Sequence, residues 1–183
     1  MTPWITKPVP FNIGQGAAAA AAVSCEDYES LSQDNLQSID GIIRNYSLKM
    51  LDGFPMIGCK IASAKWYVKG DTSIPEGNMY STLYNSAGNV RDTSAAINMS
   101  ELDHNLEWHE FSFSSPSTVA IDDFISFTAV YSEDPTGSKR VQCGRDSSGA
   151  PSTVELWLGG TDSPDDIAQE SAGRQPTVDL IAA

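Results

Sequence analysis

Apolar and polar side chains alternate with a period of two from Ile61 to Lys69. Successive side chains of a β-strand point to opposite faces, so this pattern predicts a strand with one buried and one solvent-facing side. The buried side is expected to carry Ala62, Ala64, Trp66 and Val68. The pattern returns over residues 78–85 after a loop rich in Pro and Gly, and we expect the remaining strands to pack around this pair.

Further strands are predicted on both sides of this pair. They cover residues 42–51, 107–114, 124–131, 140–145, 153–158 and 176–182. The segment 124–131 carries apolar residues on both faces, so we expect it in the centre of its sheet. Roughly seven or eight short strands separated by turns are typical of an all-β protein, an antiparallel β-sandwich, for which a jelly roll is the preferred wiring.

Two stretches depart from the strand pattern. Residues 26–41 are polar and acidic, and we expect a loop there, with a short helix over residues 28–36 as the alternative. Residues 163–166 (Ser-Pro-Asp-Asp) have the composition of a helix start, because Ser caps, Pro fits the first helical position and acids favour the positive helix end. This signature predicts a helix that ends at Gly173.

The N-terminal stretch is distinguished by its prolines and alanines. Prolines 3, 8 and 10 block a helix or a central strand, and the alanine run at 17–22 offers little side chain to bury. The stretch nevertheless carries apolar residues that a free tail would not need: Trp4, Ile5, Val9, Phe11 and Ile13. We therefore divide the chain into an extended N-terminal arm with a polar linker, residues 1–41, and a β-sandwich domain, residues 42–183. The arm either docks on a neighbouring subunit or its own domain, or is a free terminus.

Charge and cysteine content narrow the functional classes. The formal net charge of −13 over 183 residues disfavours nucleic acid and anionic membranes as partners, since phosphate is bound by Lys and Arg. No apolar run approaches the ~20 residues of a membrane span, and no signal peptide is evident. The three cysteines, Cys25, Cys59 and Cys143, make a full disulfide framework improbable but leave room for one bridge, such as Cys59–Cys143.

Residues 61–131 resemble the jelly-roll β-sandwich modules described as carbohydrate-binding-module-like. The resemblance is carried by Leu83-Tyr84-Asn85, Trp108-His109-Glu110-Phe111-Ser112-Phe113 and Val130-Tyr131-Ser132. Similar modules occur in secreted glycosidases, in surface adhesins, and in structural proteins of phages and archaeal viruses. Here no catalytic domain is attached, and the chain carries an apolar arm. These departures favour a virion or surface-assembly component.

Five aromatic residues are expected on the outward side of the predicted strands: Tyr67, Tyr80, Tyr84, Trp108 and Trp157. Tyr and Trp dominate protein contacts, and their faces also stack on sugar rings. These residues are the candidate contact or ligand site. The alternative is that loops or the arm cover some of them.

Aspartates in or next to turns offer the oxygen ligands that calcium prefers. A structural calcium is therefore one reading of Asp122, Asp123, Asp162 and Asp165, although turn chemistry alone also accounts for them. The chain has no GxSxG motif, no phosphate loop and no zinc pattern, so no other cofactor is expected. The sequence therefore predicts a protein that is not an enzyme.

We expect an acidic structural protein of a virion, such as a capsid decoration, tail or surface-lattice subunit. It would lie on a virion or cell surface and dock through its arm and sandwich faces onto other protein subunits, including copies of itself. The alternative is a carbohydrate-binding module of a secreted or cell-surface protein, whose partner is a glycan.

Overall fold

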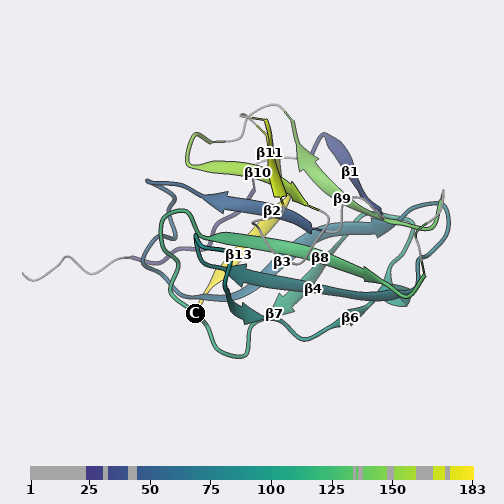
Figure 1. The fold of residues 1–183 in the computed structure, drawn as a ribbon, viewed down its shortest axis with the longest axis horizontal. Coiled ribbons are helices and arrows are strands. Elements are labelled where there is room, and N and C mark those ends of the chain that lie inside the picture. The colour runs from purple at the N-terminus through teal and green to yellow at the C-terminus, as the bar shows by residue number, and fades with distance from the viewer. Residues whose placement is uncertain are drawn as a thin grey trace, which may run out of the picture.

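The computed structural model of the protein describes residues 24–30, 33–40, 45–133, 135, 138–147, 151–159, 167–171 and 174–183. Over these residues the chain is an all-β sandwich of two antiparallel sheets, which confirms the predicted fold class (Figure 1). The apolar arm residues Trp4, Ile5, Val9, Phe11 and Ile13 lie outside the described residues. No helix in the described ranges is long and apolar enough to cross a membrane.

The first sheet contains six of the described strands. Four lie in the order β1-β9-β3-β13, while β12 pairs with β9 and β7 pairs with β3. Their bounds are β1 Asn35–Ile39, β3 Ile61–Gly70, β7 Glu107–Ser112, β9 Val141–Asp146, β12 Gln175–Pro176 and β13 Val178–Ala182. The long strand β3 pairs with β7, β9 and β13 and so forms the centre of this sheet.

The second sheet contains seven of the described strands in the order β11-β10-β2-β8-β4-β5, with β6 paired to β4. Their bounds are β2 Asn45–Met50, β4 Gly77–Tyr84, β5 Val90–Thr93, β6 Ile97–Asn98, β8 Phe124–Tyr131, β10 Val154–Gly159 and β11 Ile167–Ser171. A single 3₁₀ turn, η1 Met99–Glu101, follows β6. Strand β8 has the predicted bounds and lies between β2 and β4, as its apolar residues on both faces indicated.

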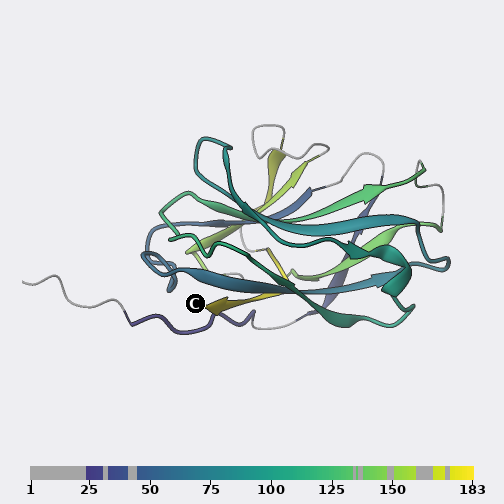
Figure 2. The same ribbon diagram turned by 90° about the horizontal axis from the view of Figure 1, so that it is seen from below.

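Apart from β5, β6, β11 and β12, which each follow a strand of their own sheet or pair at its edge, the strands alternate between the two sheets. β2, β4, β8 and β10 belong to the second sheet, and each is followed along the chain by a long strand of the first sheet, namely β3, β7, β9 and β13. Figure 2 shows the two sheets as stacked layers. The chain therefore crosses repeatedly from one sheet to the other. The sequence favoured the connectivity of a jelly roll for this sandwich.

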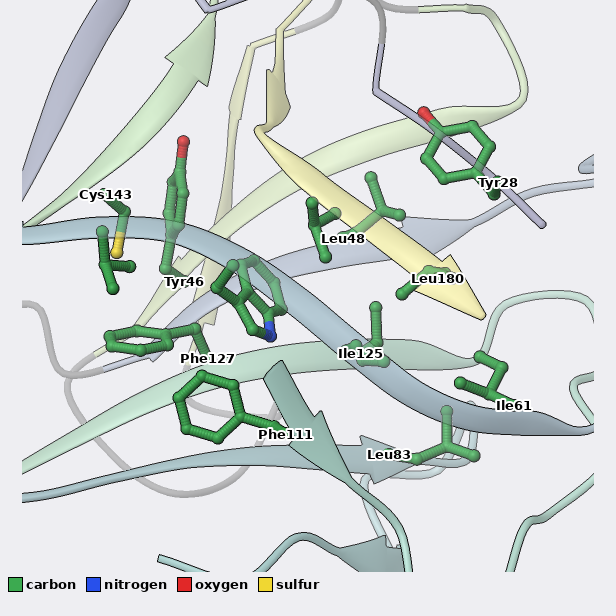
Figure 3. Close-up of a cluster of buried hydrophobic side chains, with 14 of the residues drawn as sticks. Tyr28, Tyr46, Leu48, Ile61, Leu83, Phe111, Ile125, Phe127, Cys143 and Leu180 are labelled. Carbon is green, nitrogen blue, oxygen red and sulfur yellow. The ribbon is translucent and has the colours of Figure 1, made fainter. Parts of the chain in front are cut away.

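The core lies between the two sheets and is centred on Trp66, which is fully buried. Its ring lies 5.8 Å from that of Phe127 and 6.3 Å from that of Tyr46, and Phe111 meets Phe127 edge-on at 5.9 Å (Figure 3). The indole Nε1 donates a 3.1 Å hydrogen bond to the Ser81 hydroxyl, so its polar atom is satisfied inside the core. The predicted inward side of β3 is confirmed at Ala64, Trp66 and Val68, but it is wrong at the start of the strand, where Ile61 is buried in the core and Ala62 is half-buried.

The helix predicted after residue 163 is wrong over residues 167–171. These residues form β11, which pairs antiparallel with β10 through Leu158↔Ala168 and Gly159↔Ile167. The capping signature at 163–166 lies outside the described residues. Pairing with β10 gives the backbone groups of this segment hydrogen-bond partners in the sheet, and this tertiary context overrides the local helix signal.

The loop expected over residues 26–41 is wrong at its C-terminal end. Asn35–Ile39 form β1, which pairs antiparallel with β9 at the edge of the first sheet. Ile39 is buried, whereas Asn35 is exposed and Leu36, Gln37 and Ser38 are half-buried. An edge strand buries few side chains, so its sequence lacks the alternation that identifies a central strand.

The segment before β1 is fastened to the sandwich by a disulfide. Cys25 is bonded to Cys59, and Cys143 is a buried free thiol, so the bridge considered between Cys59 and Cys143 is not the one that forms. Tyr28 lies three residues beyond Cys25, with its ring buried 4.8 Å from that of Phe54 and its hydroxyl donating to Gln175 Oε1 at 2.6 Å. Residues 24–30 therefore belong to the packed domain.

Candidate functional site

A groove lies on the outer face of the second sheet, over strand β4. Met79, Ser81 and Leu83 of this strand are buried on its inward side, so the alternate positions Tyr80, Thr82 and Tyr84 point outward. The groove is formed by these three residues together with Thr128 and Val130 from β8, and Val90 and Thr93 from β5. It therefore lies over three neighbouring strands of one sheet.

The groove is open and has a volume of about 340 Å³, which is within the size range of small-ligand sites. Tyr80 and Tyr84 are four residues apart on a strand, so their Cα atoms are separated by about 13 Å. Thr82 lies between them; Thr82 and Tyr84 are only 5% and 3% exposed, whereas Tyr80 is half-buried. Val90 is 58% exposed and Val130 41% exposed, so apolar surface of the walls faces solvent.

Buried neutral polar side chains on β8 and β2 lie beside the groove on the outward side of the sheet. Thr128 donates a 2.7 Å hydrogen bond to the Asn45 side chain, and the Ser47 hydroxyl donates to that of Ser126 at 2.9 Å. Asn45, Ser47 and Ser126 are each 1% exposed, although they lie on the outward side of their strands. Their mutual hydrogen bonds satisfy polar groups that burial would otherwise leave unpaired.

No side chain that lines the groove is a carboxylate, an amine, an imidazole or a thiol. Those four groups are among the commonest general acids, general bases and activated nucleophiles, and the hydroxyl groups of Tyr and Thr serve these roles in other sites. The groove instead offers aromatic rings, two valine side chains and hydroxyl groups. This chemistry suits the recognition of an uncharged ligand or polypeptide segment.

An aromatic cluster lies beside the groove on the same sheet. Phe124 packs against Tyr84 and meets Trp157 edge-on, with ring centroids 5.5 Å apart. Lys49 Nζ lies 5.3 Å from the Trp157 ring centroid and also pairs with Asp122 at 2.9 Å. The Trp157 indole donates to Glu155 at 3.1 Å. Trp157 is therefore partly buried and in contact with residues of its own sheet.

A second exposed aromatic site lies on the outer face of the first sheet. Tyr67 from β3 and Trp108 from β7 occupy paired positions, and their ring centroids are 5.0 Å apart. Trp108 is 45% exposed. Beside them Glu110 accepts a 2.6 Å hydrogen bond from Ser63 and lies 3.8 Å from Lys65 Nζ. We call Tyr67 and Trp108 the aromatic pair.

The five aromatic residues singled out from the sequence thus fall into three places. Tyr80 and Tyr84 share the groove, Tyr67 and Trp108 form the aromatic pair on the opposite sheet, and Trp157 packs beside the groove. Sequence reasoning missed the remaining groove residues. Thr128 and Val130 follow Phe124 on the outward side of a predicted strand, so the alternation could have identified them. Val90 and Thr93 belong to a short strand that has no such signal.

Two of the four aspartates considered for calcium, Asp122 and Asp123, have other partners. Asp122 is paired with Lys49, and Asp123 accepts the Ala120 N–H at 2.8 Å and lies 3.2 Å from Arg91. Burial raises the pKa of Asp123, while the Ala120 N–H and the Arg91 guanidinium act in the opposite direction. Asp162 and Asp165 lie outside the described residues. Among the residues that the structure describes, no three His, Cys, Asp or Glu side chains are grouped so that they could hold a metal ion.

Both histidines lie away from the groove. His109 lies on β7, in the first sheet, where it pairs with Trp66 of β3. Burial lowers the pKa of His109, whereas the charges of Glu107 and Glu101 act to raise it. His104 contacts the Asp71 carbonyl oxygen through Nδ1 at 2.6 Å. Neither imidazole is positioned to act on a ligand in the groove.

No protein-family model matches the chain, and a search of curated proteins found no relative. Similarity therefore assigns no function. The functional argument rests on the fold, the groove and the aromatic pair.

Proposed function

We propose that this protein is a non-enzymatic assembly subunit of the kind that decorates or joins a viral capsid, a tail or another surface lattice. It docks onto other protein subunits through the outer faces of its sandwich and through its N-terminal arm. One observation carries this proposal. Each outer sheet face presents aromatic or apolar side chains to solvent, and the lining of the groove carries no carboxylate, amine, imidazole or thiol.

The composition of these surfaces supports protein contact. Tyr and Trp are enriched at the energetic centres of protein interfaces, and Trp108 combines a large apolar area with exposure. The chain carries a formal net charge of −13, so self-association is opposed least where the touching surfaces are themselves uncharged. The groove supplies such an uncharged surface.

Removal of residues 1–23 tests the contribution of the arm. We expect the shortened protein to keep its sandwich, because Cys25 and everything after it remain, and to lose self-association. Far-UV circular dichroism checks the fold, and light scattering measures the mass. An unchanged oligomer after removal of the arm would contradict this role of residues 1–23.

Glycan binding is the second candidate function, and the groove is the observation that favours it. Tyr80 and Tyr84 flank a floor of hydroxyl side chains, and aromatic rings with hydroxyl groups beside them are the chemistry that holds a sugar ring. A glycan array with the full-length protein tests this function. Binding that is lost in Tyr80→Ala supports it, and an array that stays silent with and without calcium removes it.

A further inference from the structure

We propose that the groove on the second sheet receives the N-terminal arm of a neighbouring copy of this chain, through residues 8–11 (Pro-Val-Pro-Phe). This inference rests on the proposed assembly function and names the partner of the groove. It is carried by the chemistry of the groove, by the sequence of the arm, and by the place where the arm joins the sandwich.

The groove selects an uncharged occupant. Tyr80, Tyr84, Val90 and Val130 form its apolar surface, and threonine hydroxyls complete the lining. A charged segment would lose hydration there without gaining an ionic partner. The chain has 35 charged residues (11 Lys and Arg with 24 Asp and Glu), yet residues 8–23 contain none. Residues 8–23 therefore belong to the longest uncharged segment of this chain.

The sequence of the arm also suits binding in the groove in an extended conformation. Pro8 and Pro10 have a fixed φ, and Val9 precedes a proline, which disfavours the helical region for it. Residues 8–10 therefore have fewer conformations to lose on binding than an ordinary segment, so docking costs less conformational entropy. Proline-rich extended segments bind in grooves lined by aromatic residues. About four extended residues span the roughly 13 Å between Tyr80 and Tyr84.

The disulfide sets the point from which the arm extends. Cys25 is bonded to Cys59, so the chain before residue 25 starts from a fixed position on the sandwich. The 16 residues from Val9 to Cys25 span at most about 55 Å when extended. A domain of this length has a radius of gyration of about 16 Å, so the arm is long enough to reach the groove of an adjacent copy.

Site-directed cross-linking tests this placement with the full-length protein. One variant carries Val9→Cys in the arm and the other carries Thr93→Cys, an exposed position in the groove wall. The two variants are mixed and treated with a short bismaleimide, which joins two thiols. The native cysteines do not compete, because Cys25 and Cys59 are bonded to each other and Cys143 is buried. The matched control replaces Thr93→Cys by Ser112→Cys, an exposed strand position on the opposite sheet.

We expect a covalent dimer of Val9→Cys with Thr93→Cys that forms at least about tenfold faster than the dimer with Ser112→Cys. Adding Tyr80→Ala to the Thr93→Cys chain should reduce this cross-link. Equal rates for the two partners, in a protein that light scattering shows to be oligomeric, would overturn the placement of the arm and leave the assembly function standing. A protein that is monomeric and gives no covalent dimer would overturn both. Binding of an oligosaccharide that requires Tyr80, without a Val9–Thr93 cross-link, would overturn the placement in favour of the glycan function.

Discussion

Tyr28 and Leu180 exchange two backbone hydrogen bonds, 2.9 and 2.7 Å long, that fasten the segment before β1 along the last strand of the sandwich. Two side chains reinforce this attachment, because Asp27 accepts from the Ala182 N–H at 2.9 Å and Asp179 accepts from the Ser30 N–H at 3.1 Å. Together with the Cys25–Cys59 disulfide, these bonds attach residues 25–30 to the sandwich.

Loss of the disulfide should destabilise the folded domain. The bridge joins residues 34 positions apart, and closing a loop of that length is worth about 3–4 kcal/mol when the effect is attributed to the unfolded chain. We expect the double variant Cys25→Ser/Cys59→Ser to unfold at a lower urea concentration than the wild-type protein. A dithiol reductant should lower the wild-type midpoint and leave that of the variant unchanged. Equal midpoints for the oxidised wild type and the variant would contradict this role.

Tyr28 should make the fold sensitive to alkaline pH. Burial raises the pKa of Tyr28 above its usual range, and the carboxylates of Asp146 and Asp179 act in the same direction. The unfolded chain therefore loses this proton first, at about pH 10, so the stabilisation is fully present below that pH and is lost as the pH rises further. Burial raises the pKa of Tyr131 as well, with the same sign.

The variant Tyr28→Phe separates the contribution of the hydrogen bond to Gln175 from that of the ionisation of Tyr28. At neutral pH the variant should lose about 1–3 kcal/mol, because Gln175 Oε1 is buried and loses its donor. Between about pH 9 and pH 11, its free energy of unfolding should fall less steeply than that of the wild type. Urea denaturation at several pH values measures both effects. Parallel pH curves for the two proteins would show that Tyr28 does not titrate differently on folding.

Two positions on β8 provide a matched test of the core. Phe127 contacts the rings of Trp66 and Phe111 inside the sandwich, whereas Val130, three residues later, is exposed in the groove wall. Phe127→Ala should cost about 3–5 kcal/mol, and Val130→Ala should stay within about 0.5 kcal/mol of the wild type. Chemical denaturation measures both. Similar losses of unfolding free energy in the two variants would contradict the assignment of Phe127 to the core and of Val130 to the surface.

The aromatic pair should contribute to assembly more than to folding. Trp108→Ala removes an exposed ring whose stacking on Tyr67 is worth about 0.5–1.5 kcal/mol, so the domain should remain folded. The oligomer should dissociate at a protein concentration at least about tenfold higher than for the wild type. Glu107→Ala, at the exposed neighbouring position, is the control. An unchanged dissociation profile for Trp108→Ala would exclude this face from the interface.

The strands that could be predicted from the sequence are those with at least one fully apolar face, because such a face is buried in the sandwich. The alternation of β3 and the two apolar faces of β8 are direct consequences of burial on one or both sides of a sheet, so these elements could be placed with nearly correct bounds. β1 could not be predicted in this way, because an edge strand buries little. β11 was missed because a local capping signal outweighed pairing partners that only the fold brings together.

The candidate site was only half predictable. The outward positions of β4 follow from its alternation, and this gave Tyr80 and Tyr84. Which outward aromatics share a surface depends on strand order, and the sequence does not determine strand order. The same limit applies to the disulfide, since only the docking of residues 24–30 beside the loop before β3 brings Cys25 to Cys59.

The mass of the full-length protein in solution, measured by light scattering over a series of concentrations, tests the assembly function most directly. The account predicts a defined oligomer whose mass is a multiple of the 19.6 kDa chain and which dissociates on dilution. A mass of 19.6 kDa at every concentration would contradict self-assembly and would make glycan binding the function to pursue.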